Sequence, residues 1–294
     1  MTRTKRVVVF GGTGFLGRRL VSRLLDRNNL VTTASRQSST DAKDVEPRLV
    51  QVDIRDKSSL PQALEGAYAA VNCVGLYHET RTESFHDIHV VGAGNIAEAV
   101  RDFGVERFIH ISGIGVNPKS TSSYIRARTE GEYVVRSILP EAVILRPSAM
   151  FSQDGAFFGI LDTIVRYMPV IPIFGDDSTR LQPVYVGDVA EAICRTIEDE
   201  KSAGIMFELG GAEIFSYREI LERLAARSGQ RRLFLPVPFA LWSALARLAS
   251  ILPHPPITLA QVELLRNDNV VHDGAATLTD LGIEPHSATE MGLV

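Results

Sequence analysis

Lys5-Arg6-Val7-Val8-Val9-Phe10-Gly11-Gly12-Thr13-Gly14-Phe15-Leu16-Gly17 is the stretch that decides the fold. Its residues 7–10 are continuously apolar, as in a parallel strand covered on both faces. Gly11, Gly14 and Gly17 then follow at G-x-x-G-x-x-G spacing, and residues 18–25 continue with helical periodicity. This order of strand, glycine turn and helix predicts a dinucleotide-binding domain, the alternative being an ordinary strand-to-helix turn.

Each glycine of this turn has a physical task if a nucleotide binds there. Gly11 permits the tight turn, Gly14 lets the backbone approach a pyrophosphate, and Gly17 lets the helix lie close to the strand. Free N–H groups and the helix dipole then hold the phosphate charge. The cofactor contacts expected at this turn also include Thr13, Phe15 and Leu16.

The second predicted strand, residues 30–35, leads into Ser35 and Arg36. A site for NAD(H) usually has Asp or Glu here to bind the ribose 2′-hydroxyl. A guanidinium instead pairs with the oxygens of a 2′-phosphate, so we expect NADP(H) in preference to NAD(H). The alternative is an arginine that is merely solvated. Further cofactor contacts are expected after the next two strands, at Asp53, Ile54, Asn72, Val74 and Gly75.

Strands and helices alternate through the first half of the chain, up to predicted strands at 107–112 and 142–146. The alternation predicts an α/β fold, a Rossmann-type doubly wound parallel sheet with helices on both faces. Residues 1–150 would form the NADP(H)-binding domain. Residues 151–294 would form a smaller C-terminal α+β lobe, from which the chain could cross back to the sheet.

The composition, 45% hydrophobic and 22% charged over 294 residues, is typical of a soluble globular protein. A net charge of −4 gives no electrostatic reason for binding nucleic acid.

Cys73 and Cys194 lie far apart in the sequence, which favours free thiols in a reducing compartment. His86 and His89 have no further ligands near them in sequence, so we expect no metal site. With no 18-residue uncharged span, we expect a cytoplasmic protein without a transmembrane segment.

The candidate chemistry lies at the end of the strand at 107–112 and in the next helix. Ser112 precedes Tyr124 by twelve residues, and Arg128 follows Tyr124 by one helical turn on the same face. A hydroxyl, a phenol and a cation so placed can carry out acid–base work beside a nicotinamide, with Ser112 holding the substrate oxygen. We expect Arg128 to lower the pKa of Tyr124, normally about 10, toward working pH.

Several of these motifs together resemble the short-chain dehydrogenase/reductase superfamily. They are GGTGFLG at 11–17, Asp53-Ile54, Asn72 with Gly75, His110-Ile111-Ser112, and Tyr-x-x-x-basic at 124–128 followed by Glu130-Gly131-Glu132. More specific passages are 124–132, 145–148, 175–176 with 179–188, and the stretch from 235–238 to 264–269. They resemble the atypical, NAD-dependent epimerase/dehydratase-like branch that contains the NADPH-binding accessory subunit of respiratory complex I. The resemblance runs nearly end to end.

The resemblance also has consequences for individual residues. It implies that Pro147 lies near the nicotinamide, and Arg180 and Gln182 could close over that pocket or form a surface hairpin. The family pattern is Tyr-x-x-x-Lys, and Arg128 stands where the lysine belongs. In the family, that lysine holds the nicotinamide ribose and tunes the tyrosine. Arginine keeps the charge but is bulkier and planar.

Two functions follow from this resemblance. One is an NADP(H)-binding accessory or assembly-type protein of a respiratory NADH:quinone oxidoreductase complex, with little or no turnover. The alternative is an active NADPH-dependent reductase or sugar-nucleotide epimerase/dehydratase that uses Tyr124 as acid/base. The substrate, the partner and the oligomeric state are left open by the sequence.

Residues 233–252 contain one charge, Arg247, and the chain's only tryptophan, Trp242. Pro236 and Pro238 argue against a membrane-spanning helix. A helix from about 239 to 251 could be core, a partner contact or an interfacial membrane helix. We expect it to be partly exposed and to attach the protein, peripherally, to a respiratory or membrane-associated complex.

Overall fold

The fold is built on one seven-stranded sheet in which every strand is parallel to its neighbours, with the strand order β12-β6-β5-β4-β1-β2-β3. The computed structural model describes residues 4–36, 47–249 and 259–294. The strands are β1 (Arg6–Phe10), β2 (Leu30–Ser35), β3 (Arg48–Gln51), β4 (Ala69–Asn72), β5 (Arg107–Ile111), β6 (Val143–Pro147) and β12 (Met206–Leu209). The predicted doubly wound, Rossmann-type sheet is confirmed.

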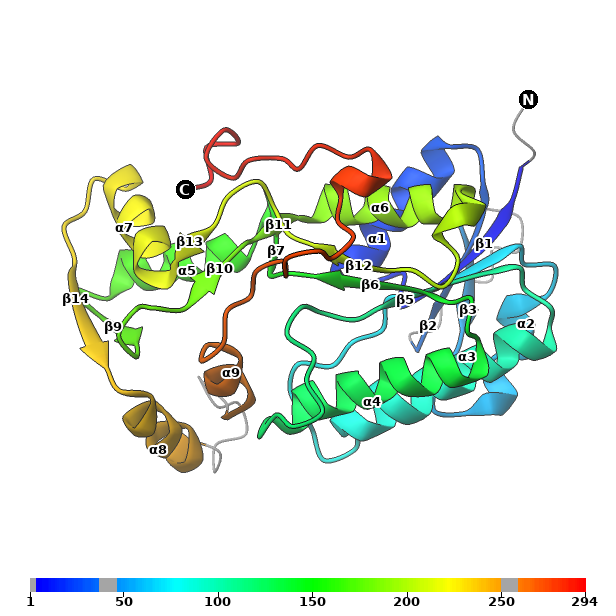
Figure 1. Cartoon of the computed structure of the whole chain (residues 1–294), viewed down its shortest axis with the longest axis horizontal. Coiled ribbons are helices and arrows are strands. Elements are labelled where there is room, and N and C mark those ends of the chain that lie inside the picture. Colours follow the sequence, from blue (N-terminus) through cyan, green and yellow to red (C-terminus); the bar gives the residue numbers. More distant parts are fainter. Residues whose placement is uncertain (1–3, 37–46, 250–258) are drawn as a thin grey trace.

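Helices cover both faces of the sheet (Figure 1). One face carries α1 (Phe15–Asp26) and α6 (Val186–Glu198), and the other carries α2 (Pro61–Leu64), α3 (Ala93–Asp102) and α4 (Ser123–Ile138). Short helical turns connect them: η1 (Lys57–Ser59), η2 (Asp87–Gly92, π-helical), η3 (Glu200–Ser202) and η4 (Thr279–Leu281). Both faces of the sheet are therefore buried, which explains why β1 is apolar at successive positions.

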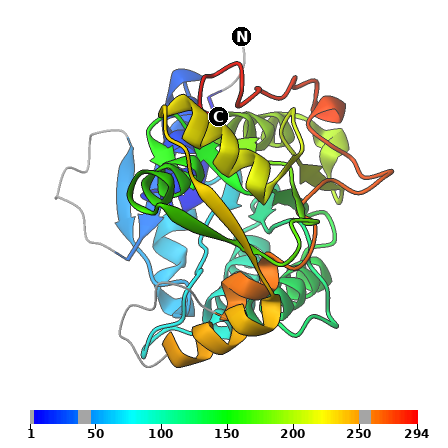
Figure 2. The same cartoon turned by 90° about the vertical axis from the view of Figure 1, so that its left-hand side faces the viewer.

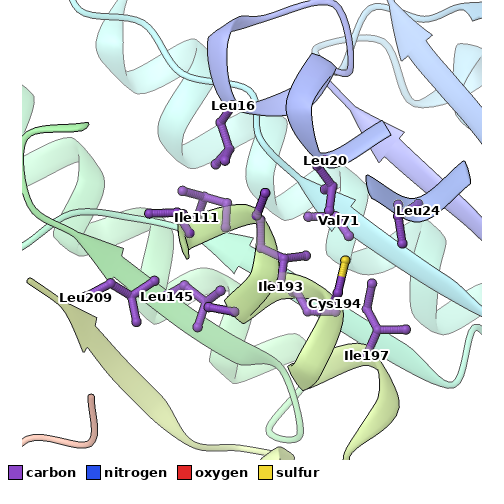
Figure 3. Close-up of a cluster of buried hydrophobic side chains, with 14 of the residues drawn as sticks. Leu16, Leu20, Leu24, Val71, Ile111, Leu145, Ile193, Cys194, Ile197 and Leu209 are labelled. Carbon is purple, nitrogen blue, oxygen red and sulfur yellow. The ribbon is translucent and has the colours of Figure 1, made fainter. Parts of the chain in front are cut away.

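The core beneath α1 explains how the first helix is held on the sheet. Leu16, Leu20 and Leu24 recur every four residues and so share one face of α1. They point toward Ile193 and Ile197 of α6 over the sheet (Figure 3). This packing fixes the N-terminus of α1, and with it the glycine turn, at the carboxyl end of β1.

A smaller lobe with its own core lies beyond the carboxyl edge of the sheet (Figures 1 and 2). Its helices are α5 (Phe157–Tyr167), α7 (Tyr217–Arg227), α8 (Phe239–Ala249) and α9 (Leu259–Leu264). Its strands are β7 (Met150–Ser152), β8 (Gly155–Ala156), β9 (Val170–Phe174), β10 (Arg180–Leu181), β11 (Val184–Tyr185), β13 (Phe215–Ser216) and β14 (Leu233–Val237). β9 and β14 pair in parallel, and α8 follows directly from β14.

The chain returns to the sheet after entering this lobe. α6 packs on the sheet, β12 adds its seventh strand, and Leu278, Leu281 and Ile283 belong to the same core as α1. A boundary at residue 150 thus describes the order along the chain but not the two spatial units. Within the described residues, no helix has the length and apolar character needed to cross a bilayer.

Candidate functional site

The glycine turn brings the backbone closer than side chains would permit. Gly11 has a φ of +75°, and a Cβ at Gly17 would lie 2.1 Å from the Gly11 carbonyl oxygen. A Cβ at Gly14 would meet only that same oxygen, at 3.2 Å, and otherwise open space. Gly14 is the N-cap of α1 and supplies no side-chain cap. The turn therefore presents the N-terminus of α1 to a ligand and fits a pyrophosphate.

The other residues expected at the turn divide between surface and core. Thr13 is exposed beside Gly14, and Phe15 is half-buried. Leu16 is 5% exposed and packs in the core under α1. Its backbone, and not its side chain, is therefore the part that a bound nucleotide can reach.

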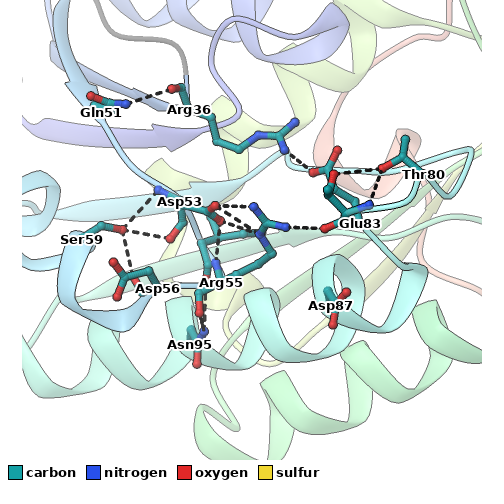
Figure 4. Close-up of polar contacts among 12 residues, drawn as sticks. Arg36, Gln51, Asp53, Arg55, Asp56, Ser59, Thr80, Glu83, Asp87 and Asn95 are labelled. Carbon is teal, nitrogen blue, oxygen red and sulfur yellow. Dashed lines mark hydrogen bonds and ion pairs between the residues drawn. The ribbon is translucent and has the colours of Figure 1, made fainter.

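Arg36 lies at the end of β2, where a 2′-phosphate is expected, and its side chain is 56% exposed. Its guanidinium forms an ion pair with Glu83 (Figure 4). The carbonyl of Arg36 accepts a hydrogen bond from Gln51 at the end of β3, and Ser35 accepts one from the N–H of Val52. Glu83 is 47 residues away in sequence and was not predicted. A 2′-phosphate would have to compete with it for Arg36.

A second arginine, also not predicted, stands beside Arg36. Arg55 donates to Asp53 at 2.6 Å and to the carbonyl of Thr82 at 2.8 Å (Figure 4). The hydrogen bonds from Arg55 to the Asp53 carboxylate, together with the charge of Arg55, hold the pKa of Asp53 below its ordinary value. The sequence could have indicated Arg55, because it lies two residues after Asp53. Ile54 is buried in the core and packs so closely on Gly92 that a Cβ there would lie 2.4 Å from its Cδ1.

Asn72 ends β4 and shapes the turn that should pass beneath the cofactor. Its amide contacts Nδ1 of His110 at 3.2 Å and accepts from the N–H of Val74 at 3.1 Å. Burial lowers the pKa of His110 to about 3, so the imidazole is neutral and can accept this bond. Asn72 is 1% exposed, and thus it holds the backbone at Val74 from within the protein.

Ser112, Tyr124 and Arg128 line one cavity. Arg128 donates to the Tyr124 hydroxyl at 2.7 Å and to the carbonyl of Ile111 at 3.2 Å. Ser112 is 3% exposed, and its Oγ has no hydrogen-bond partner among the described residues. A buried hydroxyl in that state is suited to a ligand oxygen. The structure therefore brings the three predicted residues together.

The expectation that Arg128 brings the pKa of Tyr124 down toward working pH is wrong. Burial raises the pKa of Tyr124 to about 12, and the charge of Arg128 offsets only part of this effect. Phe85, His89 and Tyr77 enclose the phenol with ring centroids 5.3, 5.5 and 5.8 Å away. Tyr124 is therefore neutral at ordinary pH and can act as a proton donor rather than a base.

The cavity has a volume of about 430 Å³ and lies between the sheet edge and the smaller lobe. Pro147 lines it, as the resemblance implied, next to Ser148. Arg180 and Gln182 are not in the lining. Arg180 pairs with Asp268 at 2.7 Å, and Gln182 donates to the Gly211 carbonyl at 2.9 Å. Both side chains therefore fix the walls of the lobe.

Asn269 is a cavity residue that lay in the resembling passage 264–269 but was given no role. Its Oδ1 accepts from the N–H of Ala149 at 3.1 Å, and its carbonyl accepts from Ser148 Oγ at 3.1 Å. It joins the end of β6 to a segment about 120 residues later.

When bound, a nicotinamide nucleotide would supply hydride chemistry at this edge, held by the glycine turn with Tyr124 and Arg128 facing it.

Comparison with known proteins agrees with this geometry. The pattern described as "NAD dependent epimerase/dehydratase family" matches residues 7–210. The chain is similar to the Arabidopsis thaliana "NADH dehydrogenase [ubiquinone] 1 alpha subcomplex subunit 9, mitochondrial", at 33% identity over 95% of this chain and 74% of that protein. It is similar to the Neurospora crassa "NADH-ubiquinone oxidoreductase 40 kDa subunit, mitochondrial", at 32% identity over 94% and 75%. A "Ceramide reductase" from Caulobacter vibrioides is 32% identical over 65% of this chain and 61% of that protein.

Solved structures share the fold. A UDP-glucose 4-epimerase from Thermus thermophilus, in complex with NAD, aligns with a TM-score of 0.63 at 20% identity, over 88% of this chain and 97% of that chain. A dTDP-4-dehydrorhamnose reductase from Bacillus anthracis, in complex with NADP, aligns with a TM-score of 0.63 at 19% identity, over 82% and 86%. Nucleotides of both kinds thus occur in proteins with this fold.

Proposed function

Because this chain belongs to the NAD dependent epimerase/dehydratase family, we propose that it binds NADP(H). We further propose that it serves as an accessory or assembly-type subunit of a respiratory NADH:quinone oxidoreductase complex, with little or no turnover. The observation that carries the proposal is the similarity to mitochondrial subunits of that enzyme over 94–95% of this chain. A match of this length includes the smaller lobe as well as the nucleotide-binding sheet.

The preference for NADP(H) is supported by the charges at the end of β2. Arg36 is largely exposed, and Arg55 reaches the neighbouring carbonyl of Thr82. The Arg36 guanidinium can pair with the oxygens of a 2′-phosphate, and Arg55, which is paired with Asp53, adds a second positive charge on this edge. Glu83 pairs with Arg36, and a 2′-phosphate would have to displace it.

This preference can be measured by calorimetry with NADPH and NADH. Arg36→Ala should weaken NADPH binding by about 10- to 100-fold, since a charge-assisted hydrogen bond contributes about 1.5–3 kcal/mol. It should leave NADH binding nearly unchanged. Glu83→Gln is the matched control, because it frees Arg36 and should tighten NADPH alone. Equal affinities for both nucleotides in the unmodified protein would contradict the preference.

Low turnover is supported by the residue that follows Tyr124 by one helical turn. The family pattern has a lysine at position 128, and here Arg128 donates to the Tyr124 hydroxyl at 2.7 Å. A planar guanidinium bound to both Tyr124 and the carbonyl of Ile111 has less freedom to reach a nicotinamide ribose than a compact ammonium.

Attachment to a larger complex is supported by exposed apolar side chains on α8. Leu241, Leu245 and Leu248, here called the α8 strip, are 51%, 44% and 69% exposed and share one helix face. Leu233 and Leu235 of β14 are also exposed, at 64% and 53%. The expectation of partial exposure is therefore confirmed for this part of 233–252, whereas residues 250–252 lie outside the described ranges.

Trp242 explains why the strip can be open while the helix remains attached. It is half-buried, stacks on Phe174 with ring centroids 4.4 Å apart, and donates to the carbonyl of Ile173 at 3.4 Å. Ala246 and Ser243 face inward as well. One side of α8 thus anchors the helix to the lobe, and the opposite side is left for a partner.

A pull-down from native membranes tests the attachment. The tagged protein should recover subunits of an NADH:quinone oxidoreductase, and it should retain NADPH through purification without consuming it. The double variant Leu245→Glu with Leu248→Glu should release the partner without unfolding the protein. Tyr133→Glu, a charge at a 75% exposed position of α4, is the matched control and should leave the complex intact. A protein that stays alone in the unmodified form contradicts the proposal.

The second candidate function is an NADPH-dependent reductase. The specific observation in its favour is that Ser112 Oγ, which has no partner in the described part of the chain, lines the same cavity as Tyr124. The similarity to the Caulobacter reductase agrees with it. Arg128→Lys should then raise NADPH oxidation with a panel of carbonyl substrates, and Tyr124→Phe should abolish it. If neither the unmodified protein nor Arg128→Lys turns over, this candidate is wrong.

A further inference from the structure

The cavity beside Tyr124 is polar at one end and apolar over most of its wall. Ser112, Tyr124 and Arg128 form the polar end at the edge of the sheet. The rest of the wall comes mainly from aliphatic and aromatic side chains of the lobe, among them Phe157, Ile160, Leu161, Ile164, Phe174 and Leu265. A volume of about 430 Å³ is in the range of a site for a small molecule.

We infer that this cavity binds an uncharged, elongated apolar molecule that carries a carbonyl or hydroxyl group at one end. The oxygen lies at Ser112 and Tyr124, and the chain extends along α5 into the lobe. This inference goes beyond the proposed accessory function and requires no turnover. It concerns a site next to the nucleotide edge, and the nucleotide itself is tested separately.

The scarcity of charged groups in the cavity lining excludes sugar nucleotides, the ligand class that the names of the structural neighbours would suggest. A sugar nucleotide carries a diphosphate, which needs cations or N–H donors to replace its hydration. Arg128 is the only charged side chain in the described lining, and its guanidinium is already bound to Tyr124 and to the carbonyl of Ile111. The nearby Arg180 is paired with Asp268. A diphosphate in the apolar part of the cavity would therefore remain unpaired.

The polar end has room for one ligand oxygen. Ser112 Oγ has no partner among the described residues, whereas the Tyr124 hydroxyl accepts from Arg128 and also interacts with the Tyr77 hydroxyl. Among the other hydroxyls of the lining, Ser148 is bound to Asn269, and Tyr217 packs against Phe174 in the lobe. The open Ser112 Oγ, with phenol hydroxyls in the same lining, suits a carbonyl oxygen and does not require a charge on the ligand.

The apolar end of the cavity reaches the protein surface at α5. Ile160 lines the cavity and is 66% exposed, so it lies at a mouth of the cavity. Phe174 lines the cavity on one side and stacks on Trp242 of α8 on the other.

Trp242 also supplies the readout, because it is the only tryptophan in the chain and contacts a cavity wall. We would titrate the full chain, with saturating NADPH, with the methyl ketones 2-heptanone, 2-nonanone and 2-undecanone, and follow Trp242 fluorescence. Each two-carbon step should tighten binding by roughly fifteenfold, the gain from burying two CH₂ groups. UDP-glucose should bind more weakly than 2-undecanone by at least about a hundredfold.

Two variants on one helix locate the binding. Ile160→Glu places a charge at the mouth and should weaken 2-undecanone binding by about tenfold or more. Tyr167→Glu places the same charge two turns along α5, at an 81% exposed position outside the lining, and should leave the affinity unchanged. Unchanged NADPH affinity in both variants, measured by calorimetry, shows that the fold and the nucleotide site are intact.

Three results would overturn the inference: affinities that do not depend on chain length, tighter binding of UDP-glucose than of 2-undecanone, or equal effects of the two glutamate variants. None of them would bear on the NADP(H) proposal, because NADPH binding is measured independently of the ketone. Conversely, a protein that binds 2-undecanone but no NADPH would refute the nucleotide proposal and leave the cavity inference standing.

Discussion

The glycine turn at residues 11–17 and helix α8 differ in what explains their sequences. At the turn, Gly17 lies so close to Gly11 that no side chain fits, and the internal geometry of the fold accounts for the residue. On α8, Leu241 and Leu248 are apolar yet more than half exposed, and nothing described in the chain covers them. A residue that the fold requires gives information about folding and ligand binding. An exposed apolar face points to a contact outside the chain.

The comparison predicts a large loss of stability at the turn. Gly17→Ala should destabilise the protein by more than about 3 kcal/mol, because its Cβ would overlap the Gly11 carbonyl oxygen at 2.1 Å and the backbone must move. Chemical denaturation measures the difference. Gly159→Ala in α5 is the control: its Cβ would meet nothing within 4 Å, and it should stabilise by about 0.5–1 kcal/mol. Similar effects for both would remove the distinction on which the comparison rests.

The neighbouring glycine should separate binding from folding. Gly14 has extended φ and ψ of −75° and −178°, and a Cβ there would lie 3.2 Å from the Gly11 carbonyl oxygen, with no other heavy atom within 4 Å. Gly14→Val should therefore lower the melting temperature much less than Gly17→Ala. It should weaken NADPH binding by about a hundredfold, since phosphate hydrogen bonds of about 1.5–3 kcal/mol each are lost. Calorimetric titration checks the affinity, and retained NADPH binding would contradict the assignment of the turn.

The contact that holds α1 on α6 should show a pH dependence. Burial acts to raise the pKa of Glu191, but hydrogen bonds from Arg195 and Arg23 and the charge of Arg27 lower it to about 2, below the ordinary 4.5. A lowered folded-state pKa contributes stability above pH 4.5 that is lost as the pH falls toward 2. After allowance for solvent screening, Glu191→Gln should cost about 1 kcal/mol at pH 7. Denaturation curves for both proteins should converge near pH 2, and a constant difference would argue against the pairing.

The smallest effect on stability is expected on the α8 strip. Leu248→Gln removes an apolar side chain that is 69% exposed, so the free energy of unfolding should change by less than about 0.5 kcal/mol. Ala246→Gln on the same helix is the matched control, because Ala246 is 1% exposed and a larger side chain there should cost about 1–3 kcal/mol. A large loss in Leu248→Gln would mean that the strip belongs to the core.

Local patterns predicted much of the fold, because they depend on neighbours in sequence. The apolar run before Gly11 predicted β1, and the turn it enters has the expected positive φ. The spacing of Tyr124 and Arg128 by one helical turn predicted their contact, which the structure shows at 2.7 Å. Ser112 lines the same cavity because it directly follows β5, a central strand of the sheet.

Contacts between remote segments could not be predicted in the same way. The ion pair of Arg36 with Glu83 joins residues 47 apart, and the link between Asn269 and Ala149 joins residues 120 apart. The pKa of Tyr124 was predicted in the wrong direction for the same reason. Its neighbour in the helix was visible in the sequence, but the side chains that remove water from it come partly from other segments.

The sequence by itself determined the parallel sheet, the glycine turn and the family, because periodicity and backbone sterics act over a few residues. Only the tertiary structure decided that Tyr124 is desolvated and that α8 keeps an apolar face open. It also decided that the cavity wall is mainly apolar, with Arg128 as the one cation in its described lining, already bound within the protein. Solvent exposure is the physical reason. It depends on every segment that packs around a side chain, and segments far apart in the chain meet only after folding.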